Sequence, residues 1–253
     1  MKKLIYLLMS LSFVAFVACS EDKEKTSSKG GSSVYKSGTQ DGHDYVDFGL
    51  PSGTKWATCN VGATKPEEFG NFYAWGEVEP KDNYACSTYK YSYSDCTVTK
   101  YKIGYNGDNK RVLDLEDDAA YVNWGGKWRM PTKAQLEELR SQCYVVFTYN
   151  YKGSKVLGDI YYKAKSSEDR GGFTWNEKAV SSYSYADAHI FLPWASSEED
   201  GKAGRDGRAS CWSSSTSDDE RYGKDGSWAI CNGSIIFRSR AEGRAVRAVI
   251  PGN

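Results

Sequence analysis

The stretch that decides the fold reads Trp124-Gly125-Gly126-Lys127-Trp128-Arg129-Met130-Pro131-Thr132, and the best helix pattern of the chain follows it directly. Thr132 is a favourable N-cap, and Gln135 stands at the reciprocal position of a capping box. An apolar stripe then runs at helical spacing through Leu136, Leu139 and Cys143. The sequence therefore predicts a helix that begins after Thr132 and is held to a core along one face.

The residues just before this helix are predicted to be structural. The Gly125-Gly126 pair is a natural stop for a preceding helix over Leu115–Trp124, which is rich in good helix formers. We expect Trp128 to fill the junction between sheet and helix, and Arg129 to reach nearby carbonyl groups or a carboxylate.

The rest of the chain is predicted to contain short strands. Upstream, an alternating run and a second strand-like run flank a turn cluster at Gly49–Gly53, and Lys65–Glu68 could open a short helix. Two early helices and later antiparallel strands predict an α+β fold. The expected strands are Asp44–Phe48, Lys55–Val61, Tyr144–Tyr149, Lys155–Ala164, Phe173–Trp175, Ile190–Trp194, Ala209–Ser214, Ser227–Ile230, Ser234–Arg238 and Ala245–Ile250.

Several stretches carry a resemblance that runs in order from Tyr45 to Ile250: Tyr45–Ala57, Asn60–Ala63, Tyr73–Glu77, Asp117–Ala120, Trp124–Thr132, Ile190–Pro193, Cys211–Ser215 and Gly243–Arg247. Together they resemble the Fibrobacter succinogenes major paralogous domain family, which is abundant in lipoproteins of Bacteroidota. That family is similar to C-type-lectin-like domains and to the formylglycine-generating enzyme fold. The resemblance implies a small twisted antiparallel sheet, two flanking helices and long loops, and it implies a fold more readily than an activity.

The N-terminal residues predict a lipid anchor. Lys2 and Lys3 precede an uncharged stretch, Leu4–Ala18, which is too short for a membrane span and ends in a small residue before Cys19. This order resembles the bacterial lipobox, in which the cysteine is lipidated and becomes the new N-terminus. We expect a signal peptide at 1–18, a flexible tether at 19–43 and one domain at 44–253. The acidic run after Cys19 resembles the surface-export signal of Bacteroidota lipoproteins, or is simply a solvated charge run.

Composition excludes some classes of function. Lys and Arg together number 33, and so do Asp and Glu, so bulk charge gives no support to a nucleic-acid binder. The chain has two histidines, His43 and His189, and neither lies in a motif with a nucleophile or a metal-ligand spacing. No cofactor and no metal site are predicted.

The cysteines predict disulfides rather than a metal site. Two pairs can be argued from local sequence: Cys86 with Cys96, around a Tyr-rich segment, and Cys211 with Cys231, across a predicted hairpin. Cys59 and Cys143 remain by elimination, and buried thiols are the alternative for them.

The acidic residues are interpreted as structural. Asp117 and Asp118 are neighbours and do not share a helix face, so favourable charge in a first helical turn is preferred over a calcium or catalytic site. The acidic loops lack the pattern of a calcium loop. The Glu-Pro-Asn and Gln-Pro-Asp triplets of calcium-dependent lectins are absent.

The predicted function is a non-enzymatic binding or adhesion module on the outer membrane, exposed at the cell surface, for a glycan or a protein. The alternatives are a glycan-active enzyme that uses the same loops and a structural envelope component. Most tryptophans are expected in the core, Trp175 among them. The candidate ligand-binding residues stand beside or within charged loops and a Tyr-rich segment, and they are Trp194, Asp218, Asp219, Arg221, Tyr89, Tyr91 and Tyr93.

Overall fold

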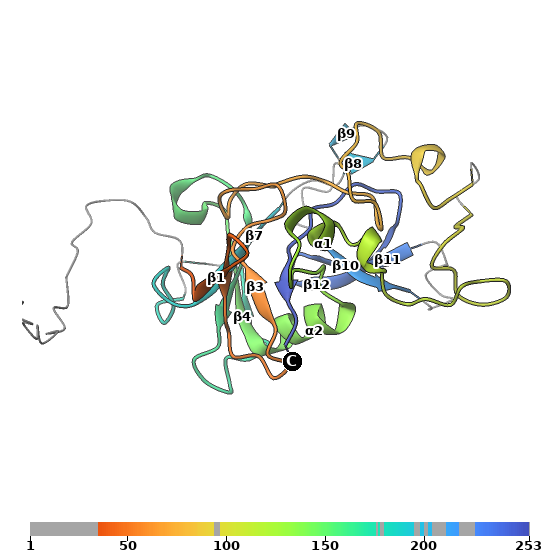
Figure 1. Cartoon of the computed structure of the whole chain (residues 1–253). Coiled ribbons are helices and arrows are strands. Elements are labelled where there is room, and N and C mark those ends of the chain that lie inside the picture. Colours follow the sequence, from red (N-terminus) through yellow and green to blue (C-terminus); the bar gives the residue numbers. More distant parts are fainter. Residues whose placement is uncertain are drawn as a thin grey trace, which may run out of the picture. The chain divides into compact units, whose positions relative to one another are not determined.

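Short strands and two α-helices make up the part of the chain that the computed structural model describes, namely residues 35–93, 97–175, 177, 180–194, 198–199, 202–203, 211–217 and 226–252. These residues belong to one unit, Ser33–Asn253. The fold is α+β, as the sequence predicts (Figure 1). Cys19 and the predicted signal peptide lie outside the described residues.

The first sheet joins the two ends of the described chain. It has the order β1-β2-β3-β13, and every pairing in it is antiparallel. Its strands are β1 (Gly38–Gln40), β2 (His43–Val46), β3 (Lys55–Ala57) and β13 (Val249–Ile250). Because β1 already pairs with β2, the folded unit begins earlier than the predicted boundary between residues 43 and 44.

The second sheet has the order β6-β4-β5-β7, in which only β4 and β6 are parallel. Its strands are β4 (Cys143–Thr148), β5 (Gly158–Lys163), β6 (Phe173–Thr174) and β7 (His189–Pro193). Both faces are buried: one carries Val145, Tyr161 and Ile190, and the other carries Val146, Ile160 and Phe191. This explains why its strands read as nearly continuous apolar runs.

The third sheet is the predicted hairpin with a further strand, in the order β10-β11-β12. A separate two-stranded ladder joins β8 and β9. The bounds are β8 (Glu198–Glu199), β9 (Lys202–Ala203), β10 (Cys211–Thr216), β11 (Gly226–Cys231) and β12 (Ser234–Ser239).

The helix after Thr132 is confirmed. α2 (Lys133–Gln142) begins after Thr132, whose Oγ1 accepts a hydrogen bond from the Gln135 backbone N–H, while Gln135 Oε1 accepts one from the Thr132 backbone N–H. Leu136 and Leu139 are fully buried, so the stripe faces the core. α2 contacts both β4–β5 and β10–β12, and therefore ties the second and third sheets together.

The predicted helix over Leu115–Trp124 is divided in two. A 3-10 turn, η2 (Leu115–Asp117), precedes α1 (Ala119–Trp124), and Asp118 caps α1 by accepting from the N–H groups of Ala120 and Tyr121. The short helix predicted at Lys65–Glu68 is wrong, since that segment is a turn. Two further 3-10 turns are η1 (Cys86–Thr88) and η3 (Tyr151–Gly153).

The stretch Trp124–Thr132 is held on three sides. Gly125 and Gly126 have positive φ angles of 71° and 55°, a backbone region that favours glycine, and a Cβ on Gly126 would also displace the Asp41 side chain, whose Oδ2 would lie 2.0 Å away. Arg129 exchanges backbone hydrogen bonds with Val249 of the first sheet, at 2.9 and 2.8 Å. The Met130 N–H donates to Asp118, so the capping carboxylate of α1 also fixes the approach to α2.

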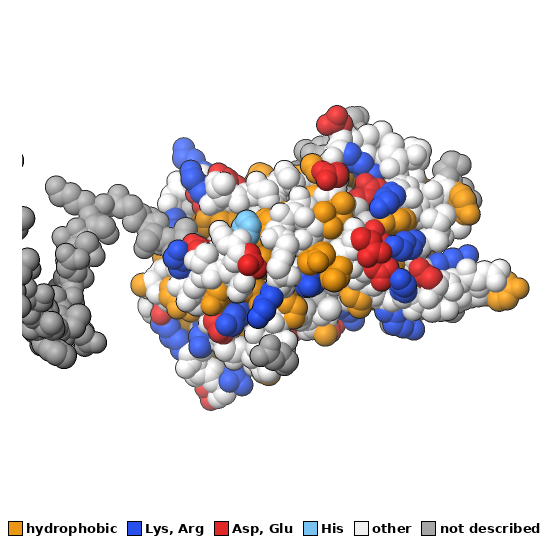
Figure 2. Space-filling model, viewed as in Figure 1, with side chains coloured by type: hydrophobic (Ala, Val, Ile, Leu, Met, Phe, Trp, Pro, Cys, Tyr) orange, Lys and Arg blue, Asp and Glu red, His pale blue; other side chains and the backbone are white. Residues whose placement is uncertain are grey.

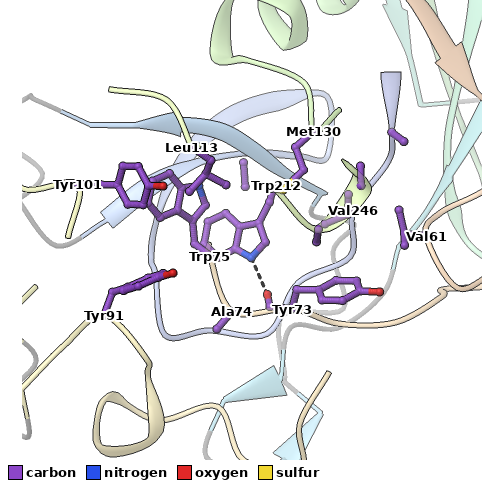
Figure 3. Packing of buried hydrophobic residues seen from close by; sticks show 14 of the residues in the cluster. Val61, Tyr73, Ala74, Trp75, Tyr91, Tyr101, Leu113, Met130, Trp212 and Val246 are labelled. Atoms are coloured by element: carbon purple, nitrogen blue, oxygen red, sulfur yellow. Dashed lines mark hydrogen bonds between the residues drawn. The ribbon is translucent and has the colours of Figure 1, made fainter. Parts of the chain in front are cut away.

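The largest core cluster is aromatic. Trp75, Trp128 and Trp212 are fully buried in it. The indole N–H of Trp75 donates to the Ser213 backbone oxygen, and that of Trp212 donates to the Tyr73 backbone oxygen (Figure 3), both at 2.8 Å. Because a buried indole needs a hydrogen-bond acceptor, these contacts fix each ring as well as burying it. Arg129 also stacks over Tyr121, with its guanidinium carbon 4.3 Å from the ring centroid.

Candidate functional site

The most exposed aromatic side chains of the second sheet gather at one of its ends. Tyr149 is 70% exposed and Trp175 is 56% exposed, and each directly follows a strand of this sheet, β4 or β6. Leu157, just before β5, is 40% exposed, and Trp194, just after β7, is half-buried. The name aromatic surface is used for Tyr149, Trp175, Trp194 and the neighbouring Leu157, together with Phe147, which packs among them.

Phe147 holds the rings of the aromatic surface in place. It is buried on β4, and its ring centroid lies 4.6 Å from that of Tyr149, 5.5 Å from that of Trp175 and 4.4 Å from that of Trp194. The first two pairs are edge-on, the arrangement that aromatic rings favour. Phe173 packs against Trp175 from a second side at 4.7 Å. The exposed rings are thus positioned by neighbours before any ligand arrives.

A buried carboxyl group adjoins the aromatic surface. Asp159 on β5 stands opposite Phe147 in the strand register and is 1% exposed. Burial raises the pKa of Asp159 to about 7, although the Trp194 side chain, the backbone N–H of Gly233 and the charge of Arg140 all act in the opposite direction.

Only part of the predicted ligand-binding set lies at this surface. Trp194 is there, whereas Asp218, Asp219 and Arg221 lie outside the described residues. Sequence reasoning missed Tyr149 and Trp175, and the placement of Trp175 in the core is wrong. Tyr149 could have been noted as the last residue of an expected strand, Tyr144–Tyr149, whereas no local signal marked Trp175 as exposed.

The predicted tyrosine face at residues 89–93 is not formed. Tyr89 and Tyr91 are buried, and the Tyr89 hydroxyl donates to the Trp75 backbone oxygen at 2.7 Å, whereas Tyr93 is 64% exposed. A shared face requires an extended strand, but η1 and the following turns divide this segment. Tyr89 and Tyr91 therefore stabilise the loop and are not available to a ligand.

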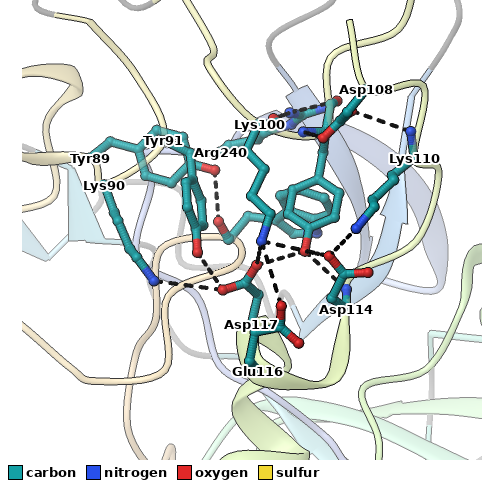
Figure 4. Close-up of polar contacts among 12 residues, drawn as sticks. Tyr89, Lys90, Tyr91, Lys100, Asp108, Lys110, Asp114, Glu116, Asp117 and Arg240 are labelled. Carbon is teal, nitrogen blue, oxygen red and sulfur yellow. Dashed lines mark hydrogen bonds and ion pairs between the residues drawn. The ribbon is translucent and has the colours of Figure 1, made fainter.

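Asp117 lies at the centre of a polar network that holds this loop (Figure 4). Its carboxylate accepts hydrogen bonds from Tyr91, from Tyr101 at 2.6 Å and from Lys100. Burial acts to raise the pKa of Asp117, but these hydrogen bonds outweigh it and leave the pKa below its ordinary value. Asp117 thus anchors this loop through its hydrogen bonds.

The network predicts a pH-dependent contribution to stability. We expect Asp117→Asn to lower the free energy of unfolding by about 1–2 kcal/mol at pH 7, because two buried hydroxyls and an ammonium lose an anionic acceptor. Since the folded pKa is lowered, this contribution is present above the unfolded pKa of the group and is lost as the pH falls through the folded value. Urea titrations at pH 7 and pH 3 measure it, and an equal difference between variant and wild type at both pH values would contradict it.

Three carboxylates of this network are close enough to share a metal ion, since oxygen atoms of Asp114, Glu116 and Asp117 lie within 4.8 Å of one another. Lys100 Nζ already lies within 4.0 Å of all three groups. The ammonium supplies the positive charge that a cation would bring, so the cluster is an ion-pair network.

A cleft of about 360 Å³ is lined by residues of and beside β2, by the segment 58–64 and by Trp124 at the end of α1. His43 stacks on Trp124 in its wall at 3.7 Å, and Cys59 also lines it. Burial lowers the pKa of His43 and raises that of Cys59, so the two groups are a neutral imidazole and a protonated thiol near pH 7. No hydrogen bond joins these two described side chains, so they do not form an activated cysteine–histidine pair.

His189 is buried and fully engaged. Its Nε2 lies 2.9 Å from the Tyr151 hydroxyl, and its Nδ1 lies 2.8 Å from the Asp187 backbone oxygen. Burial lowers its pKa, and the neutral ring fits between these partners. His189 is therefore structural.

The predicted cysteine pairs meet different outcomes. Cys86 is disulfide-bonded, but its predicted partner, Cys96, lies outside the described residues. The Cys211–Cys231 bridge is not formed: Cys211 is a buried thiol opposite Ile230, and this offset of one residue turns Cys231 to the other face of the sheet. Cys59 and Cys143 are thiols, which is the alternative to a disulfide stated above for that pair.

Comparisons with known proteins do not assign this chain to a family. No family model matches the sequence, and neither the curated proteins nor the solved structures contain a match. Within the described ranges, no helix is both long enough and apolar enough to cross a bilayer.

Proposed function

We propose that this chain is a non-enzymatic binding module, anchored to the outer membrane through lipidated Cys19 and exposed at the cell surface, which binds glycans at the aromatic surface. The observation that carries the proposal is the pair of exposed rings, Tyr149 and Trp175, held edge-on to buried Phe147. The domain is proposed to be C-type-lectin-like and a member of the Fibrobacter succinogenes major paralogous domain family, on the motifs quoted above.

The chemistry of the aromatic surface favours a sugar. The electron-rich face of an aromatic ring attracts C–H groups, and a pyranose presents several of them on one face. A stable protein interface buries about 800 Å² on each partner, which is more than a few exposed side chains supply. The face of the molecule seen in Figure 2 mixes acidic and basic side chains, with hydrophobic ones between them.

The expected result of removing both rings is loss of glycan binding. Tyr149→Ala with Trp175→Ala should weaken binding to neutral oligosaccharides on a glycan array at least tenfold, since one well-placed aromatic anchor contributes about 1.4–2 kcal/mol. Tyr105→Ala is the matched control, because Tyr105 is 90% exposed and belongs to another loop. Glycan binding that survives in the folded double variant would refute the aromatic surface as the site, and binding of a protein in its place would favour adhesion to proteins.

The anchor is tested separately. Metabolic labelling with a palmitate analogue should mark the wild-type chain and leave Cys19→Ala unlabelled, because the thiol is the proposed attachment point. Protease treatment of intact cells then reports on surface exposure. Equal labelling of the two chains would contradict the lipid anchor and leave the glycan proposal standing.

A further inference from the structure

Several buried polar atoms without a partner lie around Asp159. In the described part of the chain, Asp159 Oδ1, Trp194 Nε1 and Tyr161 Oη make no hydrogen bond of regular geometry, although the Trp194 side chain lies close enough to Asp159 to lower the pKa of that carboxyl group. Asp159 and Tyr161 are two residues apart on β5, so their side chains share a face. Folded proteins rarely leave buried polar groups unpaired, so this group of atoms calls for an explanation.

The surroundings of Asp159 come from four elements. Phe147 of β4 and Leu192 of β7 flank it in the strand register and are apolar. The turn between β11 and β12 supplies the backbone N–H of Gly233, and α2 supplies Arg140. Among the described residues, Arg140 is the one charge that acts on this carboxyl group.

Arg140 cannot fully neutralise an ionised Asp159. Its Nε donates to the Gly233 backbone oxygen and its Nη1 donates to that of Gly171, both at 2.8 Å, so the guanidinium is fixed by carbonyl groups. An ionised Asp159 then needs hydrogen bonds from other N–H donors. The indole N–H of Trp194 is the donor that belongs to the aromatic surface. A protonated carboxyl group carries no charge and attracts the indole N–H less strongly.

Protonation of Asp159 is accessible near neutral pH. Burial raises the pKa of this group to about 7, so both of its forms are populated between pH 6 and pH 8. Burial lowers the pKa of both His43 and His189, and neither ring contacts Trp194. A response of Trp194 can thus be assigned to the carboxyl group.

We propose that Asp159 is a positioning residue for Trp194, and that gain or loss of its proton changes how the indole is held at the edge of the aromatic surface. The ionised form holds the ring more firmly. The consequence for ligand binding rests on the proposed function, whereas the coupling between Asp159 and Trp194 does not.

Fluorine NMR of the full-length protein labelled with 5-fluorotryptophan tests the coupling without a ligand. The Trp194 resonance, identified by its absence in Trp194→Phe, is expected to shift with a single midpoint near pH 7, and in Asp159→Asn it should stay constant. Trp56 is the internal control, because its Nε1 is also buried and unpartnered but it lies on β3. A Trp194 resonance that ignores pH in the wild type, or titrates equally in Asp159→Asn, would overturn the proposal.

A second measurement keeps the test decisive if Asp159→Asn does not fold. The ¹³C shift of the Asp159 carboxyl in the wild-type protein should titrate with the same midpoint as the Trp194 resonance, and different midpoints would refute the coupling. Coupled titration together with no glycan binding at any pH would sustain the role of Asp159 and refute the proposed function. Glycan binding together with a Trp194 resonance that does not respond to pH would sustain the proposed function and refute the role of Asp159.

Discussion

Arg247→Met is expected to lower the free energy of unfolding by about 4–5 kcal/mol. The guanidinium is fully buried, and its Nε donates to Asn60 Oδ1 at 2.8 Å, while Nη1 and Nη2 donate to the backbone oxygens of Ala57, Thr58 and Phe191. Removing the donors takes a hydrogen bond from each of four acceptors, and leaving a buried acceptor unsatisfied costs about 1–3 kcal/mol. The new methionine recovers part of this through apolar packing.

The geometry around Arg247 explains why the loss is large. Its acceptors lie at the end of β3 and just after it in the first sheet, and on β7 of the second, so one side chain joins two sheets that share no strand. Arg247→Lys should rescue little, because a single ammonium group cannot reach acceptors in so many directions.

Urea unfolding followed by circular dichroism measures the effect. Arg111→Met is the matched control, since Arg111 is exposed and its loss should cost less than about 1 kcal/mol. A loss below about 1 kcal/mol for Arg247→Met, at an unchanged m-value, would mean that the buried guanidinium does not hold the sheets together.

The local rules of the chain made part of this fold predictable. Thr132, Gln135 and the following apolar stripe identify α2 because a cap and a helical period are read from neighbouring residues. The strands of the second sheet were found because both faces are buried and most of their residues are apolar. Such signals require no knowledge of distant contacts.

The remaining features depend on contacts between distant residues. Nothing in the sequence around Arg247 tells a buried arginine from an exposed one, because its acceptors come from segments far away in the chain. The hairpin of β10 and β11 was predicted, but its register differs by one residue, which is enough to separate Cys211 from Cys231. Tyr89 and Tyr91 were placed at the surface because alternation was read as a strand.

The candidate site was predictable only at one residue. Trp194 could be singled out because it stands beside a charged loop. Trp175 carries no local sign of exposure, and it reaches the surface because β6 is a short strand at the edge of its sheet. Each tryptophan contacts Phe147 because of the pairing order β6-β4-β5-β7, which the sequence alone does not fix.

Trp128→Ala is expected to cost about 3–5 kcal/mol, the range for deleting a buried aromatic side chain. Trp128 is fully buried, its indole N–H donates to the Gln40 backbone oxygen at 3.1 Å, and its ring packs edge-on against Trp124 at 5.1 Å. The ring thus links β1 of the first sheet to the end of α1, and truncation opens a cavity while it breaks that link.

Trp175→Ala provides the contrast for Trp128→Ala, because the same chemical change at a 56% exposed position should cost less than about 1 kcal/mol. Thermal unfolding of both variants, with glycan binding measured on each, separates the two roles. Trp128→Ala should lose stability and keep its affinity for glycans under conditions in which it remains folded. Trp175→Ala should keep its stability and lose affinity for glycans. If Trp128→Ala kept its melting temperature while it abolished binding, the stretch Trp124–Thr132 would be part of the binding site rather than the support of the fold.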